Sequence, residues 1–285
     1  MTWADTLDDH PLLALAILLA IQLPIFYMIS PKSRYFVRMF AYNSSILFAA
    51  FISSFLAIPG YLRGCGANTC FACFRACTRW LDVNAEVRNA ERLDAEGSAV
   101  IISNHQSSLD VIGMGKVWPD RCTVMMKNSL KYVPFFNIAA ILSCTVFVER
   151  FKRDKAAEAL HNAVNCILGQ NLKIWVFPEG TRNPGASMLP FKKGAFNIAV
   201  QAQIPIVPVV FSDYSPFYSK KERRFDANGQ IVGEVLEPVS TKGLTQEDVP
   251  ALTDRIRNDM LKAYERLSAE AAKRQAEVSE KTKAA

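Results

Sequence analysis

The segment SAVIISNHQSSLD, residues 98–110, joins an apolar run to a polar turn and then to a helical pattern. A continuous apolar run of this length is typical of a strand that is buried on both faces of a sheet. Four similar runs follow, at residues 122–127, 145–149, 172–177 and 205–211. Helical patterns separate several of them, at residues 109–117, 155–168 and 194–203. Strands that alternate with helices predict an α/β domain with a mostly parallel sheet flanked by helices.

A long amphipathic pattern begins near Thr245 and predicts a helix that closes the domain. Its apolar stripe consists of Leu252, Ile256, Met260, Ala263 and Leu267. Beyond Leu267 the sequence turns polar, and we expect the helix to fray there.

The composition of the whole chain excludes several classes of protein. The 285 residues are 50% hydrophobic, 21% charged and 11% aromatic, which is too apolar for a disordered chain. No fixed-period repeat is present, which excludes a solenoid. The formal net charge is +6, and the apolar residues are concentrated at one end of the chain. We therefore expect a membrane, and not nucleic acid, as the partner surface.

Residues 11–29 contain no charged side chain and can just span a hydrocarbon core about 30 Å thick. Acidic residues precede them, which disfavours a cleaved signal peptide. Lys32, Arg34 and Arg38 follow, so the positive-inside rule places this flank in the cytosol. A second apolar run, residues 46–62, has basic residues on both sides. A re-entrant or interfacial helix resolves that conflict, and a second span is the alternative.

We divide the chain into two parts. Residues 1–79 hold the membrane segments and a cysteine-rich interfacial helix, and residues 80–285 form the α/β domain with its C-terminal amphipathic helix. The interfacial helix carries the cluster Cys65, Cys70, Cys73 and Cys77. Its spacing is compatible with iron–sulfur ligation or S-palmitoylation. We favour small apolar residues that line an interfacial helix, because cysteine packs as a small hydrophobe.

The best candidate for chemistry is the pair His105 and Asp110. On a regular helix two residues five apart differ by about 140°, so they meet only if His105 lies in the turn before the helix. Ser107 and Asp110 have the spacing of a capping box, which supports that arrangement. A carboxylate on one ring nitrogen fixes the tautomer and leaves the other nitrogen to take a proton. A capping histidine packed on the sheet is the alternative.

Other apolar runs also end in charged residues. Phe177-Pro178-Glu179-Gly180-Thr181-Arg182 forms a tight turn, and its forked guanidinium suits a phosphate group. The alternative is a surface ion pair between Glu179 and Arg182. Lys127 and Arg150 end two further runs. Such convergence of cations at one sheet edge favours an anion site.

Four segments in order, residues 104–110, 147–150, 177–182 and 204–210, resemble the motifs of the glycerolipid acyltransferases. Residues 187–225 are similar to the animal 1-acylglycerol-3-phosphate acyltransferases of the endoplasmic reticulum. The resemblance implies acyl transfer from acyl-CoA to the sn-2 hydroxyl of lysophosphatidic acid, which gives phosphatidic acid. It implies no metal and no cofactor beyond acyl-CoA as co-substrate.

The resemblance also implies a role for individual residues. His105 matches the general base and Asp110 the acid that orients it. The positions that match substrate binding, chiefly at the phosphate, are Lys127, Arg150, Glu179, Gly180, Thr181 and Arg182. Pro208 matches the acyl-chain side. Glu149 departs from the aspartate that is commoner in the second motif.

Two rival functions remain open: an acyltransferase that remodels another lysophospholipid, and a non-enzymatic membrane scaffold that binds metal through its cysteines. We expect the protein in the endoplasmic-reticulum membrane with the α/β domain facing the cytosol. Lys281 and Lys283 support this, because they resemble a dilysine retrieval signal.

Overall fold

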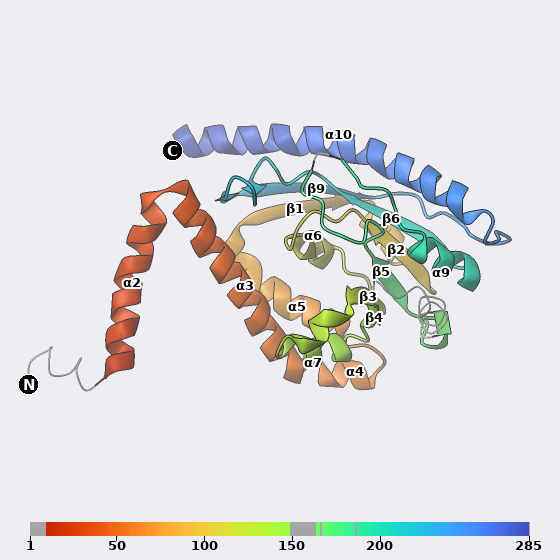
Figure 1. The fold of residues 1–285 in the computed structure, drawn as a ribbon, viewed down its shortest axis with the longest axis horizontal. Helices are drawn as coiled ribbons and strands as arrows, with labels where there is room; N and C mark the ends of the chain where they lie inside the picture. Colours follow the sequence, from red (N-terminus) through yellow and green to blue (C-terminus); the bar gives the residue numbers. More distant parts are fainter. Residues whose placement is uncertain (1–9, 149–163, 166, 186, 285) are drawn as a thin grey trace, which may run out of the picture.

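The computed structural model describes residues 10–148, 164–165, 167–185 and 187–284. Within them a seven-stranded sheet has the order β1-β9-β6-β2-β5-β3-β4 (Figure 1). Neighbouring strands are parallel except for β6 and β9, so the predicted mostly parallel sheet is confirmed. The strands are β1 (Val83–Arg88), β2 (Ala99–Ser103), β3 (Cys122–Lys127), β4 (Val146–Val148), β5 (Lys173–Val176), β6 (Ile206–Phe211) and β9 (Gly229–Val235).

The five apolar runs all become strands, whereas β1 and β9 are additions to the prediction. β1 carries Glu86 and Arg88, and β9 begins with Gly229, so neither forms a continuous apolar run. A separate two-stranded ribbon comprises β7 (Tyr218–Ser219) and β8 (Arg224–Phe225). The helix predicted at residues 155–168 lies mainly outside the described residues, although residues 164–165 and 167–169 are helical.

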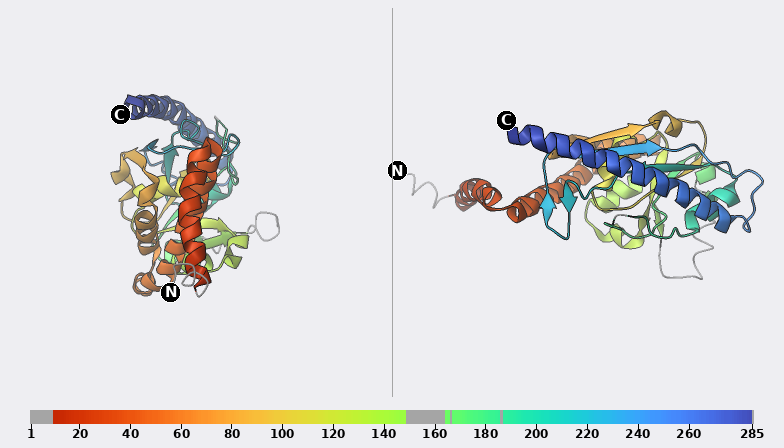
Figure 2. Two further views of the ribbon diagram at one scale, coloured as in Figure 1. Left: turned by 90° about the vertical axis from the view of Figure 1, so that its left-hand side faces the viewer. Right: turned by 90° about the horizontal axis from the view of Figure 1, so that it is seen from above.

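Alternate residues of the strands face two apolar layers, as the period of two in a strand requires. Val100 and Ile102 of β2 belong to the core under α9 (Gly194–Ala202) and α10 (Val249–Ala284). Ile101 belongs to the core on the opposite face. That face carries α6 (Asp110–Lys116), α5 (Ala67–Thr78) and part of α3 (Pro31–Leu56), and Figure 2 shows α10 crossing the other side of the domain.

The C-terminal helix has the predicted stripe, whose five residues are all buried. The expected fraying beyond Leu267 is wrong, because α10 continues to Ala284. Ala271 is buried in the same core, and the Gln275 side chain accepts a hydrogen bond from the Gln230 backbone of β9 at 3.0 Å. The segment beyond Leu267 is therefore a helix that still packs on the sheet, although most of its residues are polar.

The N-terminal part is a pair of helices, α2 (Pro11–Ile29) and α3, joined at Ser30. The Ser30 side chain caps α3 by accepting a hydrogen bond from the backbone N–H of Ser33 at 3.1 Å. Both helices are long and apolar enough to cross a membrane. The apolar run at residues 46–62 is divided between the end of α3 and the short α4 (Ile58–Leu62). Whether it spans or re-enters the membrane stays a prediction, as does the domain boundary at residue 79.

Cys70, Cys73 and Cys77 of the predicted cysteine-rich helix lie in α5, whereas Cys65 lies in the loop before it. α5 packs against α3, α6 and α7 (Phe136–Leu142). Short 3-10 turns complete the described secondary structure: η1 (Arg79–Leu81), η2 (Ala90–Leu93) and η3 (Asn128–Tyr132).

Candidate active site

The loop between β2 and α6 places its polar side chains at the carboxyl edge of the sheet, where sites of α/β proteins form. His105 lies in the turn before α6, as the spacing predicts. Its Nδ1 lies 2.6 Å from Oδ2 of Asp110. The Asp110 carboxylate also accepts the backbone N–H of Gln106 at 2.9 Å and that of Ser107 at 3.2 Å. The buried carboxylate therefore holds both the imidazole and the turn that carries it.

The predicted capping box is only half formed, because α6 begins at Asp110 with Leu109, and not Ser107, at its N-cap position. The Ser107 hydroxyl accepts the backbone N–H of Leu109 at 2.9 Å, while Asp110 reaches back to Ser107. The two side chains still satisfy backbone N–H groups ahead of the helix, although the Ser107 hydroxyl bonds to Leu109 and not to the Asp110 N–H that a capping box requires. The five-residue spacing of His105 and Asp110 thus follows from local chain geometry.

An aromatic ring also holds the imidazole. The imidazole of His105 stacks on Phe177, with ring centroids 4.0 Å apart and planes 23° apart. The His105 side chain is 15% exposed. Among the described residues, Nε2 makes no hydrogen bond. Stacking and the Asp110 bond together fix the ring so that Nε2 can meet a substrate proton.

Two amides fasten the loop to the end of β6. Asn104 donates from Nδ2 to the carbonyl of Phe211 and accepts the N–H of Phe211 at Oδ1, both at 2.9 Å. Gln106 donates from Nε2 to the carbonyl of Ser212 at 2.9 Å. These bonds are buried and restrict the loop, because breaking one leaves polar groups unsatisfied.

Glu179 is turned inward and does not pair with Arg182 in the part of the chain described. Its Oε1 accepts the backbone N–H of His105 at 2.8 Å, and its Oε2 accepts that of Leu189 at 2.9 Å. Burial raises the pKa of Glu179 above its ordinary value, and the two N–H donors oppose this shift. The carboxylate thus ties the loop after β5 to the loop after β2.

Gly180 and Lys192 form a contact that the motifs alone do not predict. Gly180 has φ +68°, in the left-handed region that favours glycine. A Cβ at this position would lie 2.7 Å from Nζ of Lys192, so the ammonium group lies directly over the turn. The sequence shows the Lys192-Lys193 pair shortly after this turn, but it does not indicate which of the two lysines contacts Gly180.

The remaining predicted residues occupy different surroundings. Thr181, Arg182 and Lys127 are exposed, and Lys127 ends β3 at the same edge as His105 because the strands are parallel. Pro208 is buried inside β6 opposite Ile102. Arg150 and Glu149 lie outside the described residues.

Two tyrosines lie behind the loop. The buried Tyr42 of α3 donates its hydroxyl to the carbonyl of Ser108 at 2.6 Å, so the N-terminal helix pair contacts the site loop directly. Burial, reinforced by the nearby Asp110 carboxylate, raises the pKa of Tyr214 well above its ordinary value. The Tyr214 side chain therefore stays neutral beside the site.

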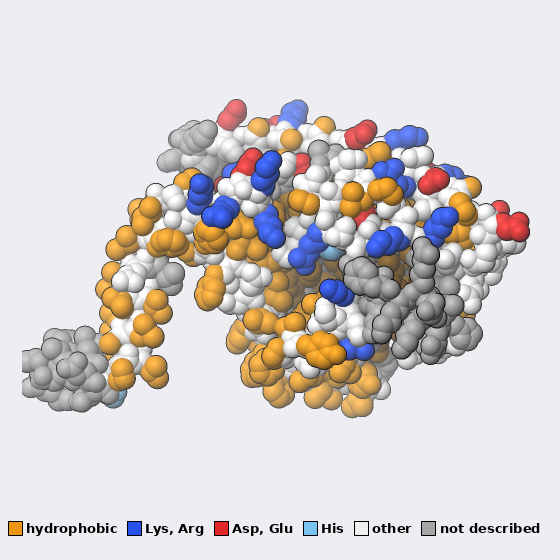
Figure 3. All heavy atoms as spheres, viewed as in Figure 1, with side chains coloured by type: hydrophobic (Ala, Val, Ile, Leu, Met, Phe, Trp, Pro, Cys, Tyr) orange, Lys and Arg blue, Asp and Glu red, His pale blue; other side chains and the backbone are white. Residues whose placement is uncertain are grey.

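The surface around the site is divided by polarity. Basic side chains gather across the middle of the face shown in Figure 3, and hydrophobic side chains gather over α4 and α7 below them. Exposed hydrophobic residues in that lower region include Ile58, Leu62, Ile138 and Ile141. This arrangement suits a substrate with an anionic head and an apolar chain.

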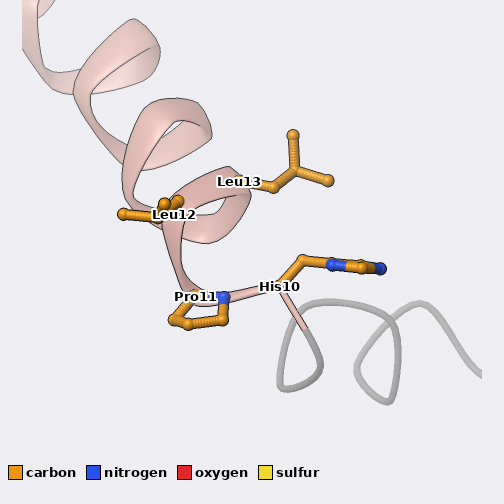
Figure 4. A pocket seen from close by; sticks show the side chains of 4 residues that line it. All are labelled: His10, Pro11, Leu12 and Leu13. Atoms are coloured by element: carbon orange, nitrogen blue, oxygen red, sulfur yellow. The ribbon is translucent and has the colours of Figure 1, made fainter.

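Two hollows lie elsewhere. One is formed by His10, Pro11, Leu12 and Leu13 at the outer start of α2, away from the sheet (Figure 4). The other lies at the opposite end of the sheet and includes Asp120 and Arg121, next to the start of β3. Within the described ranges, no group of three or more His, Cys, Asp and Glu side chains is placed to hold a metal ion.

Comparison with known proteins agrees with the arrangement of the motifs. A family model described as Acyltransferase matches residues 84–212. The human protein 1-acyl-sn-glycerol-3-phosphate acyltransferase alpha is 43% identical over 250 residues, which cover 86% of this chain and 87% of that protein. The Caenorhabditis elegans protein acl-2, provisionally named a 1-acyl-sn-glycerol-3-phosphate acyltransferase, is 47% identical over 252 residues, 88% of this chain and 89% of the worm protein.

A solved structure shares the fold. The crystal structure of the 1-acyl-sn-glycerophosphate acyltransferase PlsC from Thermotoga maritima superposes with a TM-score of 0.66 at 21% identity. The match covers 84% of this chain and 98% of that chain. With the human and worm sequences matched over most of their length, the chain belongs to the 1-acyl-sn-glycerol-3-phosphate acyltransferase family.

Proposed function

We propose that the protein transfers an acyl group from acyl-CoA to the sn-2 hydroxyl of lysophosphatidic acid, with His105 as the general base. The observation that carries this proposal is the imidazole held by Asp110 at 2.6 Å and by Phe177, with Nε2 directed to no protein partner among the described residues. The names of the human and worm relatives support the same acceptor.

The proposed step begins with the substrate hydroxyl. Nε2 of His105 takes its proton as the oxygen attacks the carbonyl carbon of the thioester. Asp110 accepts a hydrogen bond from Nδ1–H, which fixes the tautomer with a lone pair on Nε2 and stabilises the imidazolium that forms. The tetrahedral intermediate then expels the coenzyme A thiolate, and the imidazolium returns the proton to this leaving group.

The acceptor phosphate would be held by cations at the sheet edge. Arg182 has the planar fork that binds two phosphate oxygens at once, and Lys127 supplies a second charge. Lys192 adds a third cation, because its ammonium lies over Gly180 in the same turn. Thr181 lies in that turn, Arg150 follows β4 in the sequence, and Pro208 would face the acyl chain. Glu179 contributes by placing His105.

The apolar surface over α4 and α7 supports delivery of the lysophosphatidic acid acceptor from a membrane. We infer residence in the endoplasmic-reticulum membrane with the site on the cytosolic side, because acyl-CoA is a cytosolic co-substrate and basic residues follow α2.

The test is release of coenzyme A by the purified full chain in phospholipid nanodiscs. The donor is oleoyl-CoA, and the acceptors are lysophosphatidate, lysophosphatidylcholine or none. We expect rapid release only with lysophosphatidate, together with phosphatidate in the lipid extract. A preference for lysophosphatidylcholine would identify the remodelling enzyme instead. No acceptor-dependent release, with bound metal in elemental analysis, would favour the scaffold.

A further inference from the structure

Two cysteines from distant parts of the chain meet beside the sheet. Cys65 follows α4, and Cys144 follows α7. The Cys65 thiol donates to the carbonyl of Ser143 at 3.5 Å, and the Cys144 thiol donates to the carbonyl of Gly64 at 3.3 Å. Each sulfur therefore contacts the residue that precedes the other cysteine. A backbone hydrogen bond from Gly66 to Leu142 at 2.8 Å joins the same two segments.

The turn that presents Cys144 is well defined. Cys144 has φ +55°, in the left-handed region that glycine or asparagine usually occupies after a helix. Its N–H donates to the carbonyl of Ile141 at 2.9 Å, and Thr145 donates to Ala140 at 3.0 Å. A cysteine is thus held at a position that costs backbone energy, with its sulfur aimed at the loop after α4.

Cys65 has the environment of a reactive thiol, whereas its neighbours do not. A hydrogen bond with Cys144, the Ala67 backbone N–H and the Arg121 charge outweigh burial and lower the pKa of Cys65 to about 7. Burial raises the pKa of Cys70 and, more strongly, that of the fully buried Cys122. Cys65 and Cys144 are both partly exposed thiols. Thiolate character and access are the two requirements for site-selective oxidation.

We propose that Cys65 and Cys144 form an oxidisable pair that hydrogen peroxide converts into a disulfide. The Cys65 thiolate attacks one peroxide oxygen, the O–O bond breaks, and hydroxide leaves to give a sulfenic acid. The Cys144 sulfur then attacks the Cys65 sulfur, the S–O bond breaks, and water leaves with the Cys144 proton. Two electrons pass from the two sulfurs to the peroxide.

The disulfide would join α4 and α7, two helices that lie beside the sheet. It would connect the loop after α4 to the end of α7, which leads into β4. Both helices expose apolar side chains, among them Leu62 and Ile141. Oxidation would therefore fix the two exposed apolar helices to each other without touching His105.

The experiment treats the reduced full-length protein with hydrogen peroxide at pH 7, blocks remaining thiols with N-ethylmaleimide and digests with trypsin without reduction. We expect a cross-link between the peptides 64–75 and 132–150. Fragment spectra assign the link to Cys65, because the first peptide also contains Cys70 and Cys73.

Single variants make the assignment independent of the spectra. The cross-link should be lost in Cys65→Ser and in Cys144→Ser and retained in Cys70→Ser, the matched control from the same peptide. Absence of the link in the wild-type protein, or its persistence in Cys65→Ser, would overturn the proposal. Circular dichroism of each variant separates loss of the link from loss of the fold.

Discussion

The loops after β2 and β5 lie side by side at one sheet edge and use their polar residues in opposite ways. The first turns Asn104, Gln106 and Asp110 inward, and all three are buried. The second turns only Glu179 inward and leaves Thr181 and Arg182 exposed. A base must be fixed relative to the reacting atom, whereas a cation can bind phosphate through a range of side-chain positions. In the proposed mechanism, this contrast separates the residues that do the chemistry from those that recognise the substrate.

The largest effect should come from the fixed loop. His105→Ala should reduce kcat by about 10²–10⁴-fold, because the acceptor hydroxyl loses its base. The fold should survive, since the Asp110 carboxylate keeps its bonds to the backbone N–H groups of Gln106 and Ser107 and still holds the turn. The measurement is kcat with oleoyl-CoA and lysophosphatidate, alongside a thermal melt. His10→Ala, which changes an exposed histidine at the start of α2, is the matched control. More than half of the wild-type activity in folded His105→Ala would contradict the assigned mechanism.

The exposed loop should affect substrate choice instead. Arg182→Ala removes a charge-assisted contact of about 1.5–3 kcal/mol, or roughly ten- to a hundred-fold in kcat/KM for lysophosphatidate. Arg182→Lys should also be impaired, because an ammonium lacks the fork. The loss should be smaller with lysophosphatidylcholine, whose phosphate carries less charge. Arg255→Ala, at an exposed position of α10, controls for loss of positive charge. Equal proportional losses on both acceptors would make Arg182 a structural residue.

Glu179 joins the two loops, so its replacement should affect stability and catalysis together. Glutamine has one acceptor oxygen, whereas the Glu179 carboxylate accepts two backbone N–H groups. Glu179→Gln should therefore cost about 1–3 kcal/mol in the free energy of unfolding. It should lower kcat more than it raises KM, because His105 moves. Denaturant unfolding and steady-state kinetics measure both effects. Glu222→Gln, at an exposed position in the turn between β7 and β8, should change neither quantity. Unchanged kcat in Glu179→Gln would show that Glu179 does not position His105.

The parts that the sequence predicts well depend on short-range order. Apolar runs predict the central strands, and the five-residue spacing of His105 and Asp110 predicts their meeting. The strand β1 escapes prediction because its charged residues interrupt any apolar run. The inward position of Glu179 depends on the N–H of His105, 74 residues away in the chain. No local pattern contains such a contact, and the same is true of Lys192 over Gly180.

The smallest expected effect tests the contact between Lys192 and Gly180. Gly180→Ala places a methyl group where φ is +68° and where a Cβ would lie 2.7 Å from Nζ of Lys192. The backbone cost should be about 1 kcal/mol, and the flexible lysine should move aside. Gly243→Ala is the matched control, because Gly243 has φ +78° and a Cβ there would meet no described atom within 4 Å. Both variants should lose similar stability, measured by denaturant unfolding.

Only Gly180→Ala should also lose activity, by a few-fold in kcat/KM for lysophosphatidate, because the displaced ammonium no longer faces the acceptor phosphate. A double-mutant cycle with Lys192→Ala isolates this effect, since substitutions of two residues in contact are not additive. In the Lys192→Ala background, Gly180→Ala should cost stability but no further activity. If instead Gly180→Ala behaves as Gly243→Ala does in both measurements, Lys192 takes no part in phosphate binding. Recognition of the phosphate would then depend on Arg182 and the other exposed cations. The loop after β5 would differ from the loop after β2 through Arg182, and the turn at Gly180 would not contribute.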